Sequence, residues 1–74
     1  SLLEVINDYI QIAFTSGKMC KSKYSQGPQE CLLHCSLEDA IQSIQAVIPR
    51  KYTQVRTNLS LGIKIISLSS IHIH

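Results

Sequence analysis

The clearest helix of this chain is encoded by the stretch SLEDAIQSIQAVIP, residues 36–49. The hydroxyl of Ser36 suits a helix N-cap, and the acids Glu38 and Asp39 suit the positive end of the helix dipole. The apolar residues that follow recur at intervals of three and four, which places them on one helical face: Leu37, Ala40, Ile41, Ile44, Val47 and Ile48. Because proline cannot continue a helix, Pro49 marks the end. We therefore predict a helix over residues 37–48.

A second amphipathic helix is predicted over residues 2–15, near the start of the sequence. Its apolar face is formed by Leu3, Ile6, Ile10 and Ala13. Ser1 and Glu4 have the spacing of a capping box, and Gly17 followed by Lys18 is typical of a helix C-terminus.

The segment that joins these two helices is predicted to be a polar loop followed by a short helix. Residues 18–27 are rich in Lys, Ser, Gln and Gly, which is typical of a loop. Pro28 suits the first position of a helix, and we expect a short helix over residues 28–35. In that helix Cys31 and Cys35 lie on one face, and His34 points outward.

The last third of the chain is ambiguous between helix and strand. Apolar residues alternate at positions 59, 61, 63 and 65, as in a strand, but a helical period from residue 53 also separates polar from apolar stripes. A strand needs a partner strand, and no second strand or hairpin turn is available in the chain. We therefore predict a helix over residues 53–68 and keep a strand within residues 59–73 as the alternative. Residues 69–74 are expected to form a flexible tail.

These elements predict an all-α fold, a small bundle of three main helices plus one short helix, in a single domain over residues 1–74. Because the sequence begins with Ser1 inside a helical pattern, we expect it to be a fragment of a longer chain. Its three cysteines cannot all pair within one chain, and no secretory or membrane-spanning pattern is present. We expect an intracellular protein, cytoplasmic or nuclear.

The cysteines and histidines have the greatest potential for metal or nucleophile chemistry. Cys20, Cys31, Cys35 and one histidine are the ligand types of a zinc site. Their spacing argues against zinc, because Cys31 and Cys35 are separated by three residues on a predicted helix and Cys20 stands alone in the loop. The other hypotheses are a reactive thiolate at Cys35, just before a helix start, and chelation by His72 and His74. We predict no catalytic residue, no metal and no cofactor.

The distribution of aliphatic residues predicts the function. The last helix carries two adjacent apolar stripes, and three short helices cannot bury both of them. The second stripe, formed by Leu61, Ile65 and Leu68, is left for a partner protein or a second copy of the chain. We therefore expect a non-catalytic protein–protein interaction or oligomerisation module.

The alternative function is binding to nucleic acid or to another acidic surface through a lysine-rich loop. The basic residues follow predicted helix ends: Lys18, Lys21, Lys23, Arg50, Lys51 and Arg56. If the two basic segments lie side by side, they form one surface that attracts phosphates. A net charge of +2 and an aromatic content of 5% make this the weaker interpretation, because single-stranded nucleic acid is bound by stacking on aromatic side chains.

Overall fold

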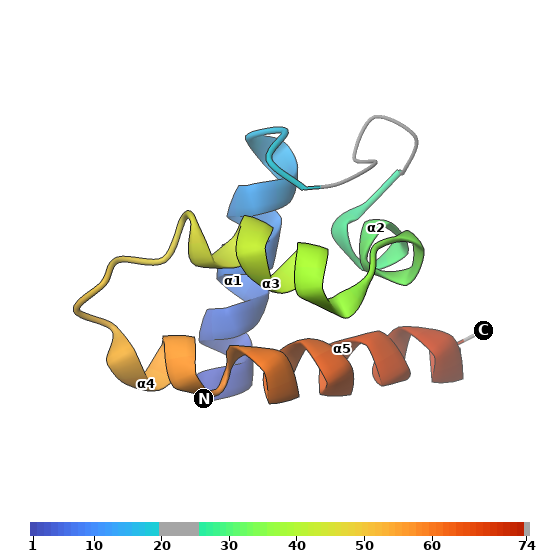
Figure 1. Ribbon diagram of the computed structural model, residues 1–74. Helices are drawn as coiled ribbons and strands as arrows, with labels where there is room; N and C mark the ends of the chain where they lie inside the picture. Colours follow the sequence, from blue (N-terminus) through green and yellow to red (C-terminus); the bar gives the residue numbers. More distant parts are fainter. Residues whose placement is uncertain (20–25, 74) are drawn as a thin grey trace.

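The computed structural model describes residues 1–19 and 26–73, with side chains of the last helix described as far as residue 69 (Figure 1). Its helices are α1 (Leu2–Thr15), α2 (Pro28–His34), α3 (Leu37–Gln45), α4 (Thr53–Thr57) and α5 (Leu59–Ile73). The described residues contain no strand, and the predicted all-α bundle is confirmed.

Helix α5 holds this bundle together. It packs against each of the other four helices, and Figure 1 shows it along the lower edge of the molecule with α1 running across it. The largest fully buried side chains are Ile6, Ile10, Cys31, Ile44 and Leu59. These side chains come from α1, α2, α3 and α5, so the helices share one core.

Helix α1 has the predicted bounds because both of its ends are fixed by local residues. At its start the Ser1 hydroxyl accepts a hydrogen bond of 3.4 Å from the Glu4 N–H, within the predicted capping box. At its end Gly17 adopts a φ of 73°, a conformation that favours glycine. The Gly17 and Lys18 N–H groups then donate to the carbonyls of Phe14 and Ala13 at 3.1 and 3.0 Å, which is the Schellman arrangement.

Helix α3 starts where predicted and ends three residues early. The Ser36 hydroxyl accepts from the Asp39 N–H at 3.2 Å, as expected of an N-cap. After Gln45 the chain forms a tighter turn of the 3₁₀ type, because the N–H groups of Val47 and Ile48 donate to carbonyls only three residues back, at 3.1 and 3.3 Å. The residue before a proline disfavours the α conformation, so Pro49 acts on the turn that precedes it.

The predicted helix over residues 53–68 is two helices in the structure. They are separated at Asn58, whose side-chain amide donates to the Gln54 carbonyl at 2.9 Å. The Thr57 hydroxyl bonds back to the Thr53 carbonyl at 2.8 Å, a contact that often bends helices. Helix α5 also continues to Ile73, beyond the predicted end at residue 68, so residues 69–73 are helical and not extended.

Gly62 allows α1 and α5 to approach each other closely. A Cβ atom at this position would lie 2.5 Å from Cδ1 and 3.3 Å from Cγ2 of Ile6. The Ile6 side chain is fully buried, so it has little room to move away. The absence of a side chain at residue 62 is therefore a condition of this helix crossing.

We predict that Gly62→Ala lowers the free energy of unfolding by up to about 2 kcal/mol. Overpacking a core costs about 1–3 kcal/mol, which equals or exceeds the gain of about 1 kcal/mol that alanine brings to a helix interior. Urea unfolding measures the difference. Ile6→Val removes the Cδ1 atom, so in that background the same change should be neutral or stabilising. If Gly62→Ala changed the free energy of unfolding by the same amount with Ile6 and with Val at residue 6, the close crossing would be contradicted.

Candidate functional site

The predicted interaction stripe lies on the outer face of α5. Leu61, Ile65 and Leu68 are 59%, 39% and 57% exposed, although they belong to the helix at the centre of the packing. The opposite face of the same helix enters the core through Leu59 and Ile63, which are 0% and 2% exposed. Spacings of four and three residues align the three exposed side chains along one side of the helix. We call these three residues the outer stripe.

An apolar groove runs beside the outer stripe. It is a cavity of about 350 Å³ between α5, α3 and the C-terminal end of α2. Leu32, Leu37, Ala40 and Ile63 supply most of its aliphatic lining, and Leu68 belongs to both the groove and the stripe. Lys64 and Ser67 contribute the polar side chains along the α5 side. The groove and the outer stripe together form one largely aliphatic surface on α5.

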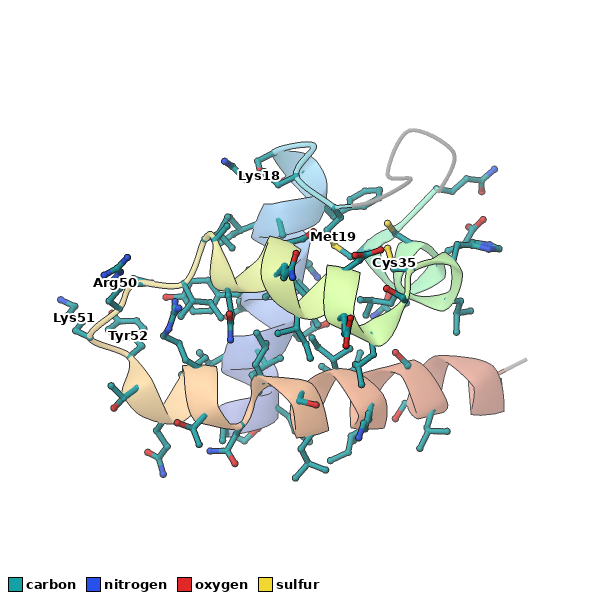
Figure 2. The ribbon with its side chains drawn as sticks, viewed as in Figure 1. Lys18, Met19, Cys35, Arg50, Lys51 and Tyr52 are labelled. Atoms are coloured by element: carbon teal, nitrogen blue, oxygen red, sulfur yellow. The ribbon has the colours of Figure 1, made fainter. Side chains whose placement is uncertain are left out.

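The described residues of the predicted basic surface lie in two places. Lys18 follows the C-terminal end of α1, whereas Arg50 and Lys51 lie in the loop between α3 and α4, and Figure 2 shows the two places well apart. The Lys51 ammonium lies 5.6 Å from the centre of the Tyr52 ring, within range of a cation–π interaction. The remaining lysines of this prediction, Lys21 and Lys23, lie outside the described residues.

Arg56 forms structural hydrogen bonds that its position in the sequence does not predict. Its Nη1 atom donates hydrogen bonds to the carbonyls of Gln45 and Ile48, at 3.1 and 3.0 Å. Gln45 is the last residue of α3, and Ile48 lies in the turn that follows it, a region where the last carbonyl groups of a helix lack α-helical partners. The half-buried guanidinium of α4 thus caps a different helix, and no local motif could have predicted this contact.

The tyrosines beside this loop form an aromatic pair. The rings of Tyr9 and Tyr52 meet edge to face, with centroids 6.3 Å apart and an interplanar angle of 69°. Burial raises the pKa of the Tyr9 hydroxyl, and the nearby Tyr52 and Asp8 raise it further. The pair fixes the α3–α4 loop against α1, which carries Tyr9.

The two described cysteines have different roles. Cys31 is fully buried in the core, as an apolar residue would be. Cys35 is half-buried and disulfide-bonded, which removes the reactive thiolate considered for it. His34 is exposed, as predicted. Cys20 lies outside the described residues.

The described part of the chain brings together no group of three or more Cys, His, Asp or Glu residues that could hold a metal ion. His74 and the side chain of His72, which the sequence offered as a chelating pair, lie outside what the structure describes.

The fold and its surface define a small all-α protein with a largely aliphatic surface along one helix. No helix within residues 1–19 and 26–73 has the length and apolar character needed to cross a membrane. Comparison with models of known families, with curated proteins and with solved structures found no match.

We predict that Arg56→Gln lowers the free energy of unfolding by about 1–3 kcal/mol, because hydrogen bonds from a charged donor are worth about that much. Arg56→Lys should recover only part of the loss, since one ammonium cannot reproduce the planar geometry of the guanidinium. Chemical denaturation provides the measurement. Lys51→Gln removes the same charge from an exposed side chain and should change stability by less than about 0.5 kcal/mol. Equal effects at the two positions would contradict the capping role.

A separate prediction concerns the disulfide at Cys35. Cys35→Ser should lower the free energy of unfolding by about 2–4 kcal/mol, because the unfolded chain loses a covalent constraint. A reductant such as dithiothreitol should lower the stability of the unsubstituted chain to a similar level and leave the variant unchanged. If reductant destabilised both proteins equally, the effect would not arise at Cys35.

Proposed function

We propose that this chain is a non-catalytic protein–protein interaction or oligomerisation module that binds through the outer stripe of α5. The observation that carries the proposal is the exposure of Leu61, Ile65 and Leu68 on the helix that contacts all the others. A helix that needs only one apolar face for its own fold has a second one available for a partner.

Leaving these apolar side chains in water costs free energy that burial would recover. Fully burying a leucine or isoleucine contributes about 1.5–3 kcal/mol, and the outer stripe leaves much of this contribution unused in the isolated chain. The core does not need the stripe, because Leu59 and Ile63 already fill the inner face of α5. Burial against a second apolar surface is thus the interaction that this face favours.

The spacing of the outer stripe indicates the kind of partner surface. Anchors at positions i, i+4 and i+7 are typical of helices that pack along another helix or into a hydrophobic groove. The adjacent cavity of about 350 Å³ offers room for apolar side chains of the partner beside Leu68. Helix packing against a second copy of this chain or against another protein uses the same contacts.

The non-catalytic part of the proposal is supported by the chemistry of that cavity. Aliphatic side chains dominate its lining, and Lys64 and Ser67 are placed along one side only. Acid–base or nucleophilic catalysis needs converging groups with matched pKa values. An aliphatic groove of this kind suits the binding of apolar side chains better.

Leu68→Asp and Ile65→Asp should each weaken association by at least about tenfold, because a carboxylate would have to be buried against an apolar surface. The isolated chain should keep its helix content, since both side chains are exposed. Sedimentation equilibrium over a range of protein concentrations measures association, and circular dichroism checks the fold.

Ile12→Asp is the matched control for this experiment. Ile12 is an exposed aliphatic residue, 47% accessible, but it lies on α1 and not on the outer stripe. Its replacement should leave the solution mass unchanged. Loss of helix content in the α5 variants would show that these residues belong to the core, and an unchanged mass in all variants would contradict self-association. Raising the salt concentration should preserve binding, whereas phosphate binding would weaken steeply.

A further inference from the structure

A second cavity lies at the C-terminal end of α3, and its chemistry is the opposite of the α5 groove. It has a volume of about 380 Å³ and is lined by Gln42, Gln45, Ala46, Ile48, Arg50 and Arg56. Two arginines and two glutamines line this cavity, and none of the described acidic residues does. The acids of α3, Glu38 and Asp39, lie in its first turn, at the other end of the helix.

Arg56 enters this cavity with its orientation already fixed. Its Nη1 atom is held by the carbonyls of Gln45 and Ile48, so little side-chain entropy remains to be lost on binding. A guanidinium has five N–H donors in a rigid plane. Within the described residues its hydrogen bonds are made by Nη1. Arg56 therefore lines the cavity with donors to spare on Nε and Nη2.

Arg50 adds a second positive charge to the same cavity. Within the described part of the chain neither arginine forms an ion pair with a carboxylate. A bound anion would meet the charge of Arg50 and the part of the Arg56 charge that the Gln45 and Ile48 carbonyls do not offset. The two glutamines supply neutral side-chain N–H donors, and the oxygens of a bound oxyanion accept hydrogen bonds from such groups as well as from arginine.

We infer that this cavity is a binding site for a phosphate group, formed by Arg50 and Arg56 with Gln42 and Gln45. Phosphate fits better than a carboxylate because its oxygens are arranged tetrahedrally and accept from donors on several sides, whereas a carboxylate is planar. The group is either free phosphate or the phosphate of a small monoester. This inference goes beyond the proposed function and does not rest on it, because the outer stripe contributes no residue to the cavity.

The test is a titration of the isotope-labelled chain with inorganic phosphate, followed by nuclear magnetic resonance at constant ionic strength. Saturable shifts are expected at the side-chain amides of Gln42 and Gln45 and at the Nε–H of Arg56. A parallel titration with phenyl phosphate distinguishes the two sources. Tighter binding of the ester indicates a phosphorylated small molecule, and tighter binding of inorganic phosphate indicates the free ion.

Arg50→Gln should weaken phosphate binding by at least about tenfold, because it removes a charge-assisted hydrogen bond. The fold should be unaffected, since Arg50 is exposed. Lys51→Gln is the matched control, because it removes the same charge from the neighbouring residue, which does not line the cavity. Its effect should stay below about threefold under physiological screening. Equal losses in the two variants, or the absence of saturable shifts, would overturn the inference. The solution mass of the Arg50→Gln variant in sedimentation equilibrium should equal that of the unsubstituted chain. Loss of phosphate binding can then be distinguished from loss of association through the outer stripe.

Discussion

The contact between the side chain of Ile6 and the backbone of α5 at Gly62 is the constraint on which this small bundle depends. With no side chain at residue 62, α1 crosses close to α5, and the Ile6 methyl groups occupy the space that a Cβ atom would need. Ile6 is fully buried, and α5 also contacts α2, α3 and α4. A chain of this size has a small core, so a shift at this crossing would disturb contacts throughout the molecule. The rotation of α5 about its own axis is therefore fixed.

That fixed rotation decides which of two apolar faces of α5 is buried. Leu59 and Ile63 share the side that meets the core, and Gly62 lies beside them against α1. Leu61, Ile65 and Leu68 must then lie on the opposite side, where no described helix covers them. Composition alone would allow either face to be buried, because both are rich in leucine and isoleucine. The small residue breaks this symmetry, since only the face that carries it allows the close approach of a second helix.

The parts of the fold that could be predicted are those determined by residues close together in the sequence. The capping box of Ser1, the N-cap of Ser36 and the glycine at residue 17 each act within one helical turn, and the bounds that depend on them are correct. The end of α3 and the break at Asn58 also involve local hydrogen bonds, but these bonds compete with a continuing helix, and the sequence does not show which arrangement is more stable. The extension of α5 to Ile73 was not predicted either. The helical period of the last third favoured a helix over a strand, and the structure is helical there, as the two helices α4 and α5. The exposure of the outer stripe followed from the same period, whereas its function stays a prediction.

The chemistry that could not be predicted comes from residues that meet across the fold. Arg56 binds carbonyls eight and eleven positions earlier in the chain, and no spacing rule connects an arginine with the end of a distant helix. From the sequence we expected Arg56 to belong to a basic surface, because a sequence shows which residues are charged but not where they lie in the fold. In the structure one nitrogen of its guanidinium binds the carbonyls at and just after the end of α3, and Arg56 also lines a cavity together with Arg50. The same planar group can hold two helices in register and recognise an anion, because its donors point in different directions in one rigid plane.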